Sequence, residues 1–83
     1  MMTIDDLLIG QKAKVVRLYD PDASAEIGGE LSERLSEIGF THGESVAVLA
    51  RSVPGGDPMV VRVGQSRFAL RRVEARCIHV VKA

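Results

Sequence analysis

The stretch SVAVLARSVPGGDPMVVRV, residues 45–63, decides the fold class of this sequence. Apolar residues recur at every second position on both sides of the central PGGDP segment. This alternation is typical of two β-strands that turn one face to a core and the other to solvent. The residues expected on the buried face are Val46, Val48, Ala50, Met59, Val61 and Val63. Val60 and Arg62 are then expected to face outward.

The PGGDP segment, Pro54 to Pro58, is predicted to be a hairpin loop. A glycine loop that binds phosphate needs a lysine within it and a helix after it, but here no lysine is near and a strand follows. Pro54 favours a turn, Gly55 and Gly56 allow positive φ, and Pro58 can begin a strand. Asp57 is expected to accept hydrogen bonds from backbone N–H groups of the turn.

The segment from Ser24 to Phe40 is predicted to be an α-helix. Its apolar stripe has the helical spacings of four, four and three, and consists of Ile27, Leu31, Leu35 and Ile38. Gly39 suits the left-handed position that ends many helices, so that Phe40 can fold back onto the last turn. The residues expected on the solvent face are Glu33, Arg34 and Glu37.

Further short elements are predicted on either side. Three strands are expected at residues 12–19, 67–70 and 77–81, a tether ends at Gly10, and residues 71–76 have room for a helical turn. The inward face of the first strand stays open, because Val15 and Val16 are adjacent, whereas Ile78 and Val80 of the last strand are expected to face inward. About five short strands, with one helix between the first and the second, favour a mainly β protein that closes as a small barrel or as two packed, curled sheets. Residues 1–83 are expected to form a single domain.

The composition limits the class of protein. Hydrophobic residues make up 46% of the chain but only three residues are aromatic, so the core must be aliphatic. The formal net charge of zero argues against a general nucleic-acid binder. Residues 1–50 hold nine acids and four bases, whereas residues 51–83 hold seven bases and two acids. Either the two halves neutralise each other in the fold, or a charged surface binds a partner.

The sequence shows no feature of secretion or membrane insertion. The N-terminal MMTIDDLLIG has two acids and no base, which does not fit a secretory signal. No apolar run approaches the roughly 20 residues that span a bilayer. A cytoplasmic protein without direct membrane insertion is expected.

Neither a metal site nor an enzyme is predicted. Cys77 and His79 would share one face of a strand and could share a metal, but His42 lies elsewhere in a turn. Zinc sites need about three or four such ligands, so no metal and no cofactor are expected. The chain has no Gly-x-Ser-x-Gly motif, and a domain with a filled aliphatic core has little room for a substrate pocket.

Arginines crowd the last third of the chain, and they are Arg62, Arg67, Arg71, Arg72 and Arg76. Arg62 and Arg67 are expected to face outward from adjacent strands. Binding of RNA by such a surface usually also needs exposed aromatic rings, but Phe68 is expected to be buried. An acidic protein surface, or the glutamates of the helix, is therefore the favoured partner of these guanidinium groups.

Several motifs follow one another in the order of a known family. These are Gly39-Phe40 at the helix end, the turn His42-Gly43, Val46 to Val48, the hairpin Pro54 to Pro58, and Arg67 to Arg71. Over about residues 10–81 the chain resembles the FeoA family, small cytoplasmic accessory proteins of bacterial ferrous iron transport. One departure is His42, which stands where proline is usual in the turn, so local mobility is expected to be higher.

The resemblance implies an SH3-like β-barrel of about five strands with a helical insertion, and no catalysis. It also implies contact with FeoB, a membrane transporter with a cytoplasmic G-protein domain. The same fold occurs as the C-terminal domain of metal-dependent repressors. Since one fold can carry many functions, this fold alone does not decide what the chain does.

The leading hypothesis is a non-enzymatic adaptor that binds such a transporter. The residues expected to bind the partner are Pro54, Gly55, Gly56, Asp57, Pro58, Arg67, Arg71 and Arg72. Three alternatives stay open: these residues only turn and solvate the chain, the chain is a metal-binding regulatory module that senses ferrous iron, or it is a small barrel that binds RNA. No nucleic-acid partner is expected. An exposed strand edge can also pair with a second copy of the chain.

Overall fold

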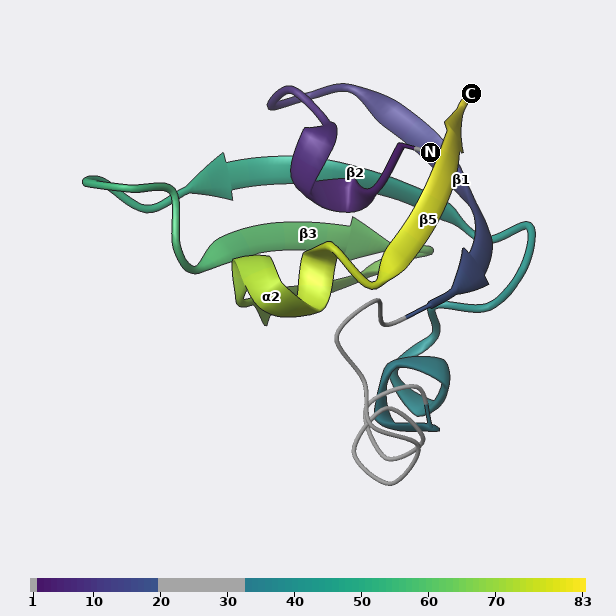
Figure 1. The fold of residues 1–83 in the computed structure, drawn as a ribbon. Coiled ribbons are helices and arrows are strands. Elements are labelled where there is room, and N and C mark those ends of the chain that lie inside the picture. The colour runs from purple at the N-terminus through teal and green to yellow at the C-terminus, as the bar shows by residue number, and fades with distance from the viewer. Residues whose placement is uncertain (1, 20–32) are drawn as a thin grey trace.

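The computed structural model describes residues 2–19 and 33–83. Five antiparallel strands form one curled sheet in the order β4-β3-β2-β1-β5 (Figure 1). The strands are β1 (Lys12–Leu18), β2 (Ser45–Arg51), β3 (Met59–Val63), β4 (Ser66–Leu70) and β5 (Ile78–Lys82). A short 3-10 helix, η1 (Ile4–Asp6), precedes β1, and the short helix α2 (Arg72–Ala75) joins β4 to β5. The predicted mainly β fold of five strands is confirmed.

The central hairpin of β2 and β3 forms from the alternating stretch. Val46 lies opposite Val63 and Val48 opposite Val61, and all four side chains are buried as predicted. The register then shifts between Val48 and Ala50, which is the mark of a β-bulge. The prediction that Ala50 lies on the buried face is wrong, because the bulge breaks the alternation and leaves Ala50 exposed.

Residues 33–38 form the helical insertion between β1 and β2. The helix ends at Gly39, whose φ is +126°. The N–H of Phe40 donates to the carbonyl of Leu35 (3.0 Å) and that of Gly39 to the carbonyl of Ser36 (3.1 Å), the two bonds of a Schellman motif. Leu35 and Phe40 are both fully buried. The predicted helix start at Ser24 and the stripe residues Ile27 and Leu31 lie outside the described residues.

β1 and β5 depart from the simple alternation that the sequence suggested. On β1, the burial of Ala13 and Val15 shows which face is inward, and the register with β5 shifts between Val15 and Arg17. On β5, Ile78 and Val80 are buried as predicted, but so is His79. His79 was expected on the other, outer face of the strand. It is buried because Tyr19 covers it there, with the two ring centroids 5.5 Å apart.

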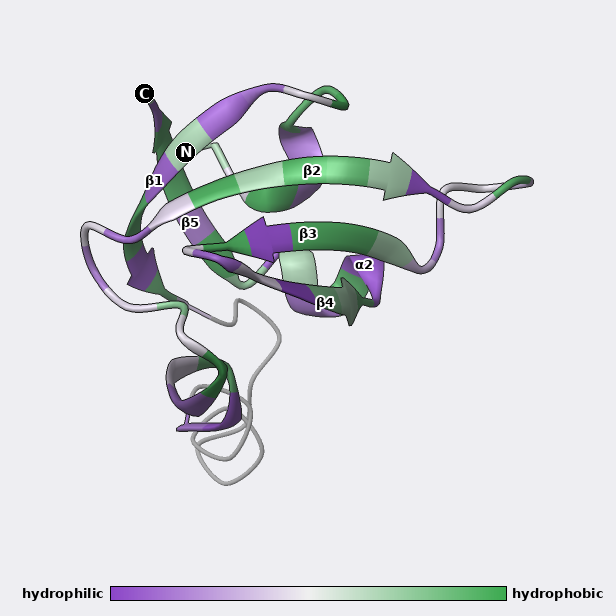
Figure 2. Cartoon of the chain, turned by 180° about the vertical axis from the view of Figure 1, so that it is seen from behind, coloured by the Kyte–Doolittle hydropathy of each residue, from purple (hydrophilic) through white to green (hydrophobic). Residues whose placement is uncertain are grey.

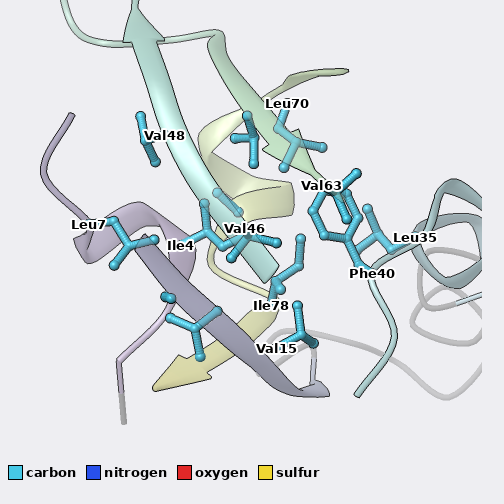
Figure 3. Close-up of a cluster of buried hydrophobic side chains, with 14 of the residues drawn as sticks. Ile4, Leu7, Val15, Leu35, Phe40, Val46, Val48, Val63, Leu70 and Ile78 are labelled. Carbon is cyan, nitrogen blue, oxygen red and sulfur yellow. The ribbon is translucent and has the colours of Figure 1, made fainter. Parts of the chain in front are cut away.

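The N-terminal segment crosses from β5, at one edge of the sheet, to β2 at its centre. The N–H of Val80 donates to the carbonyl of Met2 (2.9 Å), and the N–H of Gly10 donates to the carbonyl of Val48 (2.7 Å). Between these two points η1 turns Ile4 and Leu7 into the core. Figure 3 shows these two side chains beside Val46 and Ile78, in one aliphatic cluster. Where the structure describes the chain, no helix has both the length and the apolar character needed to cross a membrane.

Candidate functional site

The hairpin loop between β2 and β3 projects from the sheet (Figure 1). The N–H of Ser52 donates to the carbonyl of Pro58 (3.1 Å), and the N–H of Gly56 donates to the carbonyl of Ser52 (2.8 Å). Gly55 and Gly56 have φ of +86° and +73°, conformations that L side chains rarely adopt. The structure thus confirms that PGGDP turns the chain between two strands.

The hairpin loop is also fastened to α2. Oδ1 of Asp57 accepts a hydrogen bond from the backbone N–H of Arg72 (3.2 Å), and Nη1 of Arg72 reaches the carbonyl of Gly55 (3.5 Å). Asp57 was expected to accept from the turn itself. The donor is instead fifteen residues further along the chain, because α2 begins beside the loop and its first N–H groups have no partner within the helix.

The carboxylate of Asp5, near the N-terminus, forms ion pairs with three arginines, and no pattern in the sequence predicted this cluster. The atoms of Asp5 lie 3.4 Å from Nη1 of Arg51, 3.0 Å from Nε of Arg72 and 3.4 Å from Nε of Arg76. Nη2 of Arg51 also donates to the backbone carbonyls of Asp5 (2.9 Å) and Leu7 (3.0 Å). The side chain of Asp5 keeps only 11% of its surface exposed.

Burial by itself would raise the pKa of Asp5, because it disfavours the charged carboxylate. Hydrogen bonds from Arg72 and Arg51 and the charge of Arg72 outweigh burial, so the pKa of Asp5 lies below its ordinary value. The hydrogen bond to Asp5 in turn raises the pKa of Arg72. Asp5 is therefore ionised at neutral pH, and its ion pairs join η1, the end of β2 and α2.

The three arginines predicted to bind a partner fall into two groups. Arg72 is engaged by Asp5 and by the hairpin loop. Arg67 and Arg71 are exposed, and within residues 2–19 and 33–83 neither side chain makes an ion pair. Arg67 lies directly opposite Arg62 in the β3–β4 pair, which confirms that these two occupy adjacent strands.

Two exposed valines lie beside the hairpin loop and on α2, and neither was predicted as a binding residue. Val53, which precedes the hairpin prolines, keeps 94% of its surface exposed, and Val73 on α2 keeps 60%. Val53 lies two residues beyond β2, whose alternation breaks at a bulge, so the pattern did not predict whether Val53 is buried or exposed. Val73 lies in a helix of four residues, too short to show a stripe. We call Val53–Pro58 together with Arg71–Val73 the hairpin–α2 surface.

The residues considered as metal ligands have other contacts. His79 is buried, and its Nδ1 accepts from Nε of Arg17 (3.4 Å). Burial, followed by the charge of Arg17, lowers the pKa of His79. Sγ of Cys77 donates to the carbonyl of Val73 (3.3 Å). Within the part of the chain that the structure describes, no three His, Cys, Asp or Glu side chains are grouped so as to hold a metal ion.

The chain was compared with known families and structures. The FeoA domain family matches residues 2–82. The FeoA of Stenotrophomonas maltophilia, a prokaryotic SH3 domain protein solved with zinc, is 37% identical, with a TM-score of 0.82; the match covers 98% of this chain and 91% of that one. The FeoA protein of Chlorobium tepidum is 30% identical, with a TM-score of 0.76; the match covers 98% of this chain and 70% of that one.

A manganese-dependent transcriptional repressor shares the fold alone. It is 21% identical, with a TM-score of 0.79, and the match covers 99% of this chain and 41% of the repressor. No curated protein sequence matches this chain. The family match spans nearly the whole chain. The FeoA structures resemble the chain in sequence and have the same SH3-like fold. The chain therefore belongs to the FeoA domain family.

Proposed function

We propose that this chain is an accessory protein of ferrous iron transport that acts in the cytoplasm by contacting a FeoB-type membrane transporter. The match to the FeoA domain over residues 2–82 carries this proposal. The hairpin–α2 surface supports it, because this surface is fixed in place and yet leaves its side chains exposed. Recognition by a loop on a rigid scaffold loses little conformational entropy on binding.

The composition of the hairpin–α2 surface suits a protein partner. Val53 and Val73 offer apolar groups, and the exposed Arg71 offers a charge that makes no ion pair within the described residues. Apolar anchors flanked by arginine are common where proteins bind one another. The surface acts through contact, and we propose no catalytic step.

Binding to the transporter's cytoplasmic G-protein domain tests the proposal. Val53→Asp and Arg71→Glu are the informative variants, since neither native side chain is buried or paired with an acid in the described residues. Each is expected to weaken binding by about fivefold or more, the loss of roughly 1 kcal/mol. Lys82→Glu, an exposed charge reversal at the end of β5, is the matched control and is expected to bind like the native chain.

Arg72→Glu is unsuitable for this test, because it would place a carboxylate against Asp5 and disturb the fold. A G-protein domain that binds the native chain, Val53→Asp and Arg71→Glu equally well would remove the hairpin–α2 surface from the proposal. A domain that binds none of them would contradict the contact itself.

Direct iron sensing makes a different prediction. If the chain acts through protein contact alone, anaerobic calorimetry with ferrous ion is expected to show only weak, non-saturating heat. Saturation at one ion per chain would favour the alternative, a metal-binding regulatory module. Cys77→Ser and His79→Gln would then show whether these two side chains supply ligands.

A further inference from the structure

The two outer strands of the sheet differ in how their edges are covered. β5 is covered by the start of the chain, where Val80 bonds to Met2 and Thr3 forms a bridge with His79. β4 pairs with β3 on one side, and no described residue bridges its other side. Figure 2 shows β4 at the outer edge of the sheet, below β3 in that view. In an antiparallel pair every second residue directs its N–H and C=O away from the neighbouring strand. Along this edge β4 therefore presents backbone donors and acceptors that no other described strand pairs with.

Arginine side chains gather beside this edge. The arginines of the ion pairs are Arg34, Arg51, Arg72 and Arg76. No ion pair with a described residue is formed by Arg62 on β3, Arg67 on β4 or Arg71 just after β4. Arg62 and Arg67 are direct cross-strand partners. Like charges placed opposite each other destabilise a sheet, so this pair favours a carboxylate brought from outside.

Apolar groups lie on both faces of the same edge. Phe68, opposite Val61 on the inner face, is only half-buried although it packs against the core. On the outer face, Ala69 is exposed and lies opposite Val60, which keeps 37% of its surface exposed. One more strand beside β4 would cover Phe68 on the inner face and would place its outer residues next to Arg67 and Ala69.

We propose that the free edge of β4 binds an extended acidic segment of a partner protein as a sixth strand. Apolar and acidic residues alternate along this segment: the apolar ones cover Phe68 and the acidic ones face Arg62, Arg67 and Arg71. Main-chain hydrogen bonds supply affinity, and the alternating side chains supply specificity. This inference rests on the proposed function in one respect, since it states which kind of segment the protein partner presents.

Two other occupants of this edge are disfavoured, one by charge and the other by the lack of an exposed aromatic ring on β4. A second copy paired through its own β4 would bring the two Arg67 side chains, and the two Arg71 side chains, into one sheet of like charge. Single-stranded nucleic acid would match the charge, but it is usually held by exposed aromatic rings. The aromatic residue of β4, Phe68, packs against the core.

A synthetic peptide of alternating valine and glutamate, about eight residues long, tests the proposal by amide NMR of the full chain. The peptide is expected to shift the amide signals of Ser66–Leu70 and to slow their hydrogen exchange. The matched peptide, with lysine in place of each glutamate, is expected to bind at least about tenfold more weakly, because it repels the arginines. A glutamate peptide N-methylated at every residue is expected not to bind, since neither of its edges has an N–H group to donate to β4.

Variants of the chain locate the site. Arg67→Glu is expected to weaken binding of the glutamate peptide by about fivefold or more, whereas the control Lys82→Glu leaves binding unchanged. Dispersed amide signals verify that both variants fold, and Arg67→Gln gives a milder change should Arg67→Glu fold poorly. Equal binding of the two peptides, amide shifts that avoid β4, or equally tight binding of oligouridine at β4 would each overturn the inference.

The transporter experiment separates this failure from a failure of the proposed function. If the glutamate peptide does not bind β4 but the G-protein domain still binds the native chain, the strand inference is wrong and the proposed contact stands. If the peptide binds and the domain does not, the edge recognises an acidic strand of another protein.

Discussion

Asp5 joins three parts of the chain that lie far apart in the sequence. Its carboxylate meets Arg51 at the end of β2, and Arg72 and Arg76 at the two ends of α2. These ion pairs fasten η1 to the same helix that holds the hairpin loop through Asp57. Hydrogen bonds to charged groups that lie largely out of water stabilise more than exposed pairs do. Asp5 therefore helps to hold α2, and with it the hairpin–α2 surface, in position.

Asp5→Asn is expected to lower the free energy of unfolding by about 1–3 kcal/mol, the loss typical when charged hydrogen-bonding groups lose their partner. The asparagine keeps the shape of the side chain but leaves Arg51, Arg72 and Arg76 together without a carboxylate. Urea unfolding at neutral pH measures the change. Glu37→Gln, which removes an exposed carboxylate from the helix of residues 33–38, is the control and is expected to change little.

The same carboxylate predicts how stability depends on pH. The pKa of Asp5 in the fold lies below its ordinary value of 3.8, so its contribution to stability is complete above that value. The contribution is lost as the pH falls through the lower pKa of the folded state. The stability difference between the native chain and Asp5→Asn is thus expected to shrink on acidification. A difference that stays constant from about pH 6 to about pH 2 would show that the charge of Asp5 does not stabilise the fold.

His42 occupies the second position of a turn in which the N–H of Glu44 donates to the carbonyl of Thr41 (3.0 Å). Gly43, at the third position, has φ of +85°, as a type II turn requires, and such turns favour proline at the second position. His42→Pro is expected to stabilise the chain by about 0.4–1 kcal/mol by restricting the unfolded state. Thermal unfolding measures this. A loss of stability would mean that the backbone at residue 42 does not suit proline.

At the scale of elements, the helix of residues 33–38 shows how one apolar side chain holds an insertion to the sheet. Leu35 is fully buried beside Phe40, and its carbonyl accepts the N–H of Phe40 that closes the helix end (Figure 3). Arg34 on the same helix pairs with Glu74 of α2 at 2.9 Å. The ion pair is half in solvent, so the packing of Leu35 is the stronger attachment.

Leu35→Ala is expected to lower the free energy of unfolding by about 2–5 kcal/mol, because the cavity it leaves lies in a core that cannot fully close. Ser36→Ala, at the next and exposed position of the helix, is the matched control. Denaturant unfolding compares the two. A loss below about 1 kcal/mol for Leu35→Ala would contradict the burial of this side chain.

Elements with a local signal were predictable from the sequence. Glycines and prolines mark the hairpin loop, and Gly39 marks the end of the helix, because both depend on the conformations that a few adjacent residues allow. The bulge that turns Ala50 outward has no such signal, since it depends on how β2 pairs with β3. The burial of His79 depends on Tyr19, sixty residues earlier in the sequence. The residues of the cluster around Asp5 are equally far apart in the sequence. The only sequence feature that suggested such ion pairs was the excess of acids in residues 1–50 and of bases in residues 51–83.

At the scale of the whole molecule, that imbalance is partly resolved within the fold. Asp5, from the acidic half, pairs with Arg51, Arg72 and Arg76 of the basic half, which supports the interpretation that the two halves neutralise each other. Of the four basic residues of that half that are left over, Lys82 lies at the end of β5 and the three arginines lie together. Arg62 and Arg67 are cross-strand neighbours, and Arg71 directly follows β4. A core filled by aliphatic side chains and a surface with a local excess of positive charge suit a molecule that works through its exterior.

Hydrogen exchange of the native chain, measured with and without the transporter's cytoplasmic G-protein domain, tests this account most directly. Slower exchange is predicted in the hairpin–α2 surface, Val53–Pro58 and Arg71–Val73, and along β4, with little change in the helix of residues 33–38. Slower exchange confined to that helix and to the end of β5, with the hairpin and β4 unaffected, would contradict it.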